Sequence, residues 1–62
     1  MNANQLKESR IKVGLSQNEL AEKVAVTQAT ISNWEHGKGK PSSAQQETLK
    51  AVLVGQRLML HR

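Results

Sequence analysis

The sequence contains no cysteine and a single aromatic residue, Trp34, so several common ways of stabilising a small protein are missing. Without cysteine the chain can form neither a disulfide framework nor a cysteine-based zinc site. The two histidines, His36 and His61, are too few and too far apart in sequence to suggest a metal site. With 62 residues the chain lies near the lower size limit for a single hydrophobic core. We therefore expect one domain over residues 1–62, held together by helix packing and without a cofactor.

Long apolar runs are also missing. No stretch approaches the roughly 18 apolar residues of a membrane-spanning helix, and the segment 1–5 lacks the apolar core of a signal peptide. We therefore expect a cytoplasmic protein.

The charge balance is basic, with nine Lys and Arg against five Asp and Glu and a net charge of +4. This favours an anionic partner, nucleic acid first and an acidic membrane second, although solubility alone is an alternative explanation. An enzyme is not expected, because no nucleophile and base are paired and the segment 37–40 lacks P-loop spacing.

Capping and stop signals predict four helices. The first starts at Asn2 or Asn4 and runs to about Val13, with Gly14 as its stop. The second follows Ser16, which forms a capping box with Glu19. The third lies between Thr27 and Gly37. The fourth starts at Ser42 or Ser43 and runs to about Val54, where Gly55 ends or breaks it.

Helical spacing assigns one inward side to each of these segments. The expected core positions are Leu6, Arg10, Val13 and Ile11 in the first helix, Leu20, Ala21 and Val24 in the second, Ile31 and Trp34 in the third, and Ala44, Leu49, Val52 and Leu53 in the fourth. Gln45, Gln46, Glu47 and Lys50 are expected to face water. Because only residues 25–27 join the second and third helices, these two must cross steeply, which is the geometry of a helix-turn-helix.

The third helix has an outward face without carboxylates, formed by Gln28, Ala29, Ser32 and Asn33. Amides of this kind pair with adenine, hydroxyls with several acceptors, and a methyl group with the methyl of thymine. A merely polar surface is the alternative, but solvated helix faces usually carry Glu and Lys. The face therefore suits the floor of a DNA groove.

An arginine on the inward side of the first helix needs a carboxylate partner. Glu35 is the candidate, and a loose surface pair of little value is the alternative.

The segment 55–62 carries three consecutive apolar residues, Leu58, Met59 and Leu60. It reads either as a final turn that covers the open end of the core or as a surface for self-association or a protein partner.

Two motifs together carry a family resemblance. The run Leu15-Ser16-Gln17-Asn18-Glu19-Leu20-Ala21 and the segment Thr27 to Lys38, followed by Pro41-Ser42, resemble the lambda-repressor-like family. This family includes the Cro and cI-type and the XRE-type regulators, and the similarity covers about residues 4–54. The resemblance implies a compact all-α domain of four to five helices whose second and third helices form the helix-turn-helix, with the third in the major groove.

Carried over by position, the resemblance implies two sets of DNA contacts. The base-reading set is Gln17, Gln28, Ala29, Ser32 and Asn33. The phosphate set is Ser16, Asn18, Thr27, Thr30, His36, Lys38 and Lys40. The first-turn amides near Gln17 and the lysines of a glycine-containing loop are also physically suited to phosphate.

Two further positions bear on this resemblance. Arg10 and Glu35 match the places where phage 434-type members have an ion pair. At Ala25 the family usually has glycine, so either Ala25 adopts a left-handed backbone or the turn differs.

These patterns predict a sequence-specific regulator, repressor-like, that binds a pseudo-palindromic operator in double-stranded DNA as a homodimer. It would be bacterial or phage-encoded, and nucleoid-associated when bound. The alternative is a protein-interaction or DNA-targeting module of a larger or antitoxin-type assembly.

Overall fold

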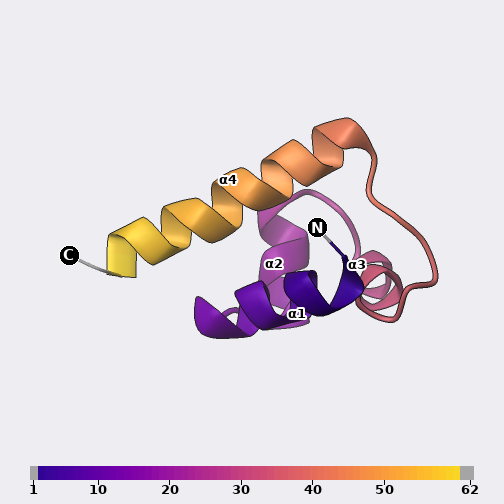
Figure 1. Ribbon diagram of the computed structural model, residues 1–62, viewed down its shortest axis with the longest axis horizontal. Coiled ribbons are helices and arrows are strands. Elements are labelled where there is room, and N and C mark those ends of the chain that lie inside the picture. Colours follow the sequence, from indigo (N-terminus) through magenta and orange to yellow (C-terminus); the bar gives the residue numbers. More distant parts are fainter. Residues whose placement is uncertain (1, 61–62) are drawn as a thin grey trace.

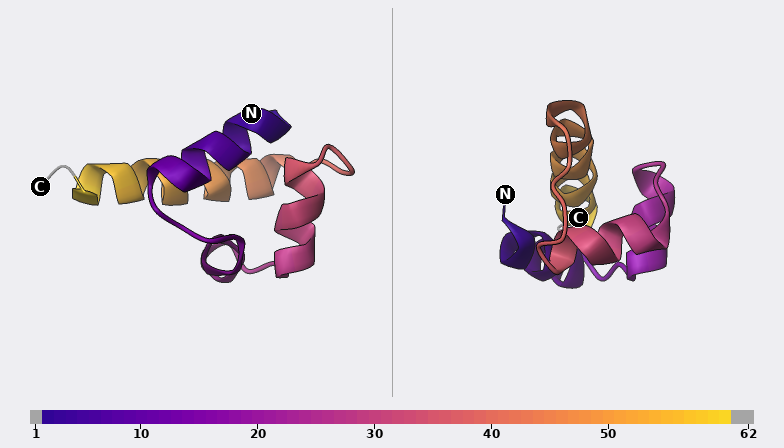
Figure 2. Two further views of the ribbon diagram at one scale, coloured as in Figure 1. Left: turned by 90° about the horizontal axis from the view of Figure 1, so that it is seen from below. Right: turned by 90° about the vertical axis from the view of Figure 1, so that its right-hand side faces the viewer.

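The chain forms four helices and no strand within residues 2–60, the part that the computed structural model describes, with side chains placed through residue 54. The helices are α1 (Ala3–Lys12), α2 (Gln17–Lys23), α3 (Gln28–Glu35) and α4 (Ser43–Leu60). Figure 1 shows α1 and α4 running in the same general direction with α2 between them, and the views of Figure 2 show α3 lying across one end. The expected all-α class is confirmed.

Side-chain caps determine where the helices begin. In α1, α2 and α4 the cap side chain accepts the amide three residues on, and the side chain of that residue accepts the amide of the cap. The pairs are Asn2–Gln5, Ser16–Glu19 and Ser42–Gln45. Such reciprocal boxes satisfy two otherwise unpaired backbone donors at a helix start. The sequence therefore located the starts correctly, with Asn2 and Ser42 chosen from the alternatives.

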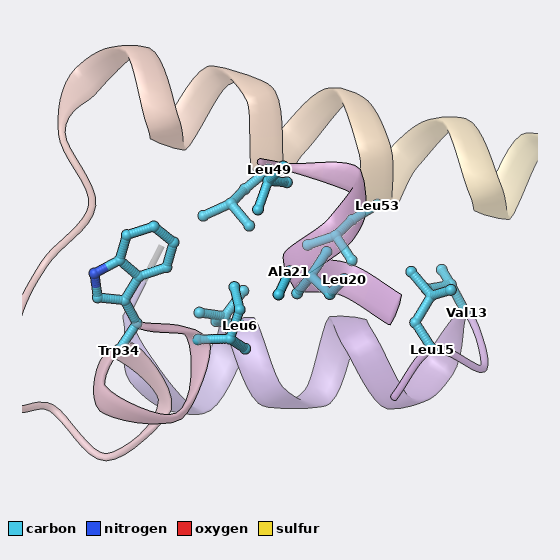
Figure 3. Packing of buried hydrophobic residues seen from close by; sticks show 10 residues of the cluster. Leu6, Val13, Leu15, Leu20, Ala21, Trp34, Leu49 and Leu53 are labelled. Carbon is cyan, nitrogen blue, oxygen red and sulfur yellow. The ribbon is translucent and has the colours of Figure 1, made fainter. Parts of the chain in front are cut away.

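The hydrophobic core draws on every helix (Figure 3). Its buried members are Leu6, Val13, Leu15, Leu20, Ala21, Val24, Ile31, Trp34, Leu49 and Leu53. Leu20 and Ile31 are completely inaccessible to solvent. Trp34 packs as predicted, which fixes the inward side of α3 and leaves its opposite side to solvent.

Two expected core positions are wrong. Ile11 is 57% exposed, because at about 3.6 residues per turn it lies roughly 140–160° around the helix from the buried Leu6 and Val13. Ala44 is also exposed, because the inward stripe of α4 runs through Leu49 and Leu53.

The start of α4 is less solvated than expected. Gln45 and Gln46 are half-buried, Gln45 because it completes the cap at Ser42 and Gln46 because its Nε2 donates to the Pro41 carbonyl at 3.3 Å. These amides tie the preceding loop to α4.

The prediction that Gly55 ends or breaks the fourth helix is wrong. Helix α4 continues through Gly55 to Leu60, because a glycine inside a helix costs only about 1 kcal/mol relative to alanine. Within residues 2–60 there is consequently no separate fifth helix. The side chains of Leu58, Met59 and Leu60, and with them the predicted association surface, lie outside the described residues. Neither α4 nor any other helix of the described part is long and apolar enough to span a membrane.

Candidate nucleic-acid interface

Helix α3 presents an outward face of short polar side chains. Thr27 caps the helix, its Oγ1 accepting the Thr30 amide at 3.2 Å. Because Ile31 and Trp34 anchor the opposite side in the core, Gln28, Ala29 and Asn33 are exposed; Ser32 is half-buried. The predicted reading positions therefore lie together on one accessible surface.

The only carboxylate of α3 is turned away from this face. The Glu35 side chain is 2% exposed, and its Oε2 accepts a hydrogen bond from Arg10 Nε at 2.6 Å. Arg10 Nη2 donates to Glu35 Oε1 at 3.3 Å, and Nη1 donates to the Leu15 carbonyl at 2.8 Å. The guanidinium thus joins α1, the loop before α2 and the C-terminal end of α3. A buried charge needs such pairing, which is what the inward arginine required.

Gln17 connects this ion pair to the outward face. Its Nε2 donates to Glu35 Oε1 at 3.0 Å, and its Oε1 accepts from Gln28 Nε2 at 2.6 Å. Gln28 still has its Oε1 and one N–H, the two groups that a bidentate contact with adenine needs. The geometry therefore favours Gln17 as a residue that positions Gln28.

This network was not predicted as a whole. The sequence pointed to Arg10 and Glu35 through the inward arginine, but the link through Gln17 depends on the tertiary packing of α2 against α3. The only signal for it was the presence of long amides at both helix starts.

The turn between α2 and α3 has a left-handed residue. Ala25 has φ 61°, and the Val26 amide donates to the Ala21 carbonyl at 3.0 Å. The turn therefore keeps the backbone that glycine favours even though the residue is alanine. This conformation brings the start of α3 beside the start of α2.

The predicted phosphate contacts lie at the starts of α2 and α3 and at the C-terminal end of α3. Ser16, Asn18, Thr27 and Thr30 lie at the helix starts, and His36, Lys38 and Lys40 lie at or after the C-terminal end.

Several of these groups already have intramolecular partners. The Thr27 and Thr30 hydroxyls are 2.9 Å apart, and Ser16 Oγ accepts the Glu19 amide at 3.0 Å. His36 Nδ1 lies 2.7 Å from the Ser32 carbonyl, which leaves its Nε2 for another contact. Lys38 and Lys40 are exposed and follow the C-terminal end of α3, so their ammonium groups are accessible to a ligand.

The capping box of α2 changes the acidity of Glu19. The pKa of its carboxyl is lowered because it accepts the Ser16 backbone N–H, with a further contribution from the Ser16 side chain. The carboxylate is therefore bound to its own helix start, and it is not part of the outward face of α3.

A comparison with protein families agrees with this geometry. The family model described as helix-turn-helix matches residues 6–53, which include all of α2 and α3. No curated protein and no solved structure matches the chain.

Proposed function

The chain belongs to the helix-turn-helix family, whose members bind double-stranded DNA, and on this premise we propose that it is a sequence-specific transcriptional regulator. The observation that carries the proposal is the carboxylate-free face of α3, with Gln28, Ala29 and Asn33 exposed and Glu35 buried. A groove floor lined by base edges and flanked by phosphates repels carboxylates and accepts amides.

In this proposal α3 lies in the major groove. Gln28 and Asn33 each make a bidentate contact with adenine, Ala29 contacts a thymine methyl, and Ser32 accepts or donates to a neighbouring base edge. Gln17 holds the Gln28 amide in place, and Glu35 fixes Gln17 in turn. Arg10 and Glu35 form the ion pair expected of phage 434-type members, which supports a kinship with those members within the family.

Phosphate contacts position the helix without reading sequence. Lys38 and Lys40 bind the backbone beyond the C-terminal end of α3. Asn18 and the helix-start hydroxyls face the backbone at the other end, and His36 adds its Nε2. The protein acts in the cytoplasm as a repressor that occludes its operator, and it binds as a homodimer because one such domain reads only a half-site.

Selection of binding sites from a randomised duplex pool at about physiological salt tests the proposal. The expected result is a two-fold symmetric motif with adenines in each half-site, and its recovery should be lost with Asn33→Ala. If no motif emerges while binding falls steeply with salt, the domain is only an electrostatic clamp on DNA and the proposal is wrong.

A second function class rests on α4. Val54 on α4 is 53% exposed and offers apolar surface to a protein partner of the antitoxin type. This alternative predicts weak DNA binding without a sequence preference, which the same selection detects.

A further inference from the structure

A cleft lies beside Trp34, on the side of α3 opposite the reading face. It has a volume of about 540 Å³ and is enclosed by the start of α1, the loop after α3 and the first turns of α4. Two of the most deeply buried core residues, Leu6 and Leu49, contribute to its lining, and so does Pro41. Its size is in the range of sites that hold small molecules, and none of the proposed base-reading residues lines it.

The indole of Trp34 directs a hydrogen-bond donor into this cleft. The residue as a whole is only 7% exposed, but no buried side-chain nitrogen or oxygen of the described residues lacks a partner, so its Nε1–H, for which no protein acceptor is found there, is open to solvent. Figure 3 shows the indole nitrogen on the side of the ring turned away from Leu6 and Leu49. The adjacent Cδ1 faces Gly39 of the loop, where an added Cβ would lie 3.8 Å away. A donor that is open to solvent and has no protein acceptor among the described residues is available to a ligand.

The electrostatics of the cleft favour an anion. Its described lining includes Lys40 and no carboxylate. Asn2 and Ala3 belong to the start of α1, a ten-residue helix without an acidic residue in its first turn, and the dipole of such a start attracts negative charge. The side-chain acceptors there are already used, because Asn2 Oδ1 and Gln5 Oε1 bind each other's backbone amides.

The opposing end of α3 is capped, as the start of α1 is. Its last carbonyls are capped, since the Gly37 amide donates to the Trp34 carbonyl at 3.2 Å and the Lys38 amide donates to the Asn33 carbonyl at 2.8 Å. The cleft therefore combines an apolar floor with a directed donor and a cation.

We propose that this cleft binds a small organic carboxylate. The carboxylate accepts the Trp34 Nε1–H and lies beside the Lys40 ammonium, and its apolar body covers Leu6 and Leu49. Because the loop that forms one wall joins α3 to α4, an occupied cleft also holds the segment that carries Lys38 and Lys40.

The test follows the indole N–H signal in two-dimensional ¹H–¹⁵N NMR. The chain has one tryptophan, so this signal is unique. Sodium hexanoate is titrated against sodium chloride at equal ionic strength, with hexanamide as the uncharged analogue of the same shape. The expected result is a saturable shift of the indole signal with hexanoate and at least about fivefold weaker binding of hexanamide. An unsaturable shift, or equal binding of the two compounds, overturns the proposal.

Two variants locate the site. Lys40→Ala should weaken hexanoate binding about three- to fivefold, whereas Lys38→Ala removes the same charge from a residue outside the lining and should change it less than twofold. Equal effects of the two variants overturn the assignment of the cation.

Gly39→Leu fills the cleft from the loop. Gly39 has no positive φ, and its Cβ would make an ordinary van der Waals contact, so the fold tolerates the change. The saturable shift should disappear while the melting temperature is kept; binding at the parent affinity places the ligand elsewhere and overturns the proposal. The titration contains no DNA, so its outcome is separate from the outcome of the operator selection.

Discussion

Glu35 combines a structural role with a role in the shape of the reading face. Its carboxylate accepts hydrogen bonds from Arg10 and Gln17, and it is almost completely withdrawn from water. Removing one partner of a buried pair leaves the other charge without compensation. The pair therefore fixes the position of α3 relative to α1.

Glu35→Ala should lower the free energy of unfolding by about 3–5 kcal/mol, because it strands the Arg10 guanidinium. Denaturant unfolding followed by Trp34 fluorescence measures this. Glu47→Ala, at an exposed position of α4, is the matched control and should stay within about 0.5 kcal/mol of the parent.

If Glu35→Ala does not fold, the double variant Arg10→Met with Glu35→Leu keeps the prediction testable. Replacing both charges by apolar groups of similar size is often neutral, so the double variant should fold. A loss below about 0.5 kcal/mol for Glu35→Ala would contradict the buried pair.

Ala25 occupies a backbone conformation that alanine adopts at a cost. At φ 61° the left-handed region disfavours a Cβ by about 1–2 kcal/mol, whereas glycine loses about 0.5–1 kcal/mol of entropy on folding. Ala25→Gly should therefore be neutral or stabilising by up to about 1 kcal/mol.

Thermal unfolding by circular dichroism measures this difference. Ala51→Gly, at an exposed position within α4, is the control for the general effect of glycine and should cost about 1 kcal/mol. A clear drop in Tm for Ala25→Gly, similar to that of the control, would contradict the strain at this turn.

At the scale of whole helices, features set by interactions within one helix were predicted better than features set by packing between helices. The starts of α2 and α3 were predictable, because Ser16 and Thr27 satisfy amides within their own first turn. The residues at the edge of each helix's inward side were harder to predict, because a step of one residue turns a side chain by about 100° around the helix. Ile11 is an example. The end of α4 was mispredicted, because the stop signal of Gly55 is weak inside a strong helical pattern.

The outward face of α3 could be predicted from the sequence pattern, whereas the hydrogen-bond network behind it could not. Periodicity alone placed Gln28 and Asn33 outside, since Ile31 and Trp34 had to be inside. The hydrogen bonds of Gln17 to Glu35 and Gln28 join residues 18 and 11 positions apart, and they exist only once α2 packs on α3.

The α2 capping box should make stability depend on pH. The folded state lowers the pKa of Glu19 below its ordinary value of 4.5, so the unfolded chain takes up the proton first as the pH falls. The contribution is fully present above the unfolded pKa and is lost as the pH falls through the folded pKa. Glu19→Gln keeps a side chain that can cap but does not titrate.

The parent should therefore be more stable than Glu19→Gln near neutral pH, with the difference shrinking below pH 4.5. Denaturant midpoints for both proteins between about pH 7 and pH 3 measure this. Glu22→Gln, on the exposed side of the same helix, serves as a control for the loss of charge. A difference independent of pH would contradict the assigned cause.

Base-reading and phosphate-binding residues around α3 should differ in how their substitution affects DNA binding. Gln28→Ala should weaken binding to the selected operator by about 1–3 kcal/mol and relax the preference at one base pair. Lys38→Ala should weaken binding to all duplexes alike and reduce the slope of log affinity against log salt by about 1. Titration of operator and scrambled duplexes at several salt concentrations separates the two. Identical effects on both duplexes from both variants would remove the distinction between reading and positioning.

In the proposed function, one helix-turn-helix domain reads only a half-site of the operator. Helix α3 has eight residues and exposes only a few base-reading side chains, which is enough for one half-site. Two copies related by two-fold symmetry would place their α3 helices in successive major grooves, roughly 34–36 Å or 10–10.5 base pairs apart. The spacing between half-sites should therefore determine affinity.

Inserting about 5 base pairs between the half-sites of the selected operator turns them to opposite faces of the duplex, and inserting about 10 restores their alignment. If the two copies contact each other, binding of the second copy should lose its cooperativity with the shorter insert, because no single dimer can then reach both half-sites. Analytical ultracentrifugation of the three duplexes at fixed protein concentration gives stoichiometry and affinity together. Two copies bound with equal affinity to all three duplexes would show that the domains bind independently, and the operator would then be a tandem of separate sites with no dimer on it.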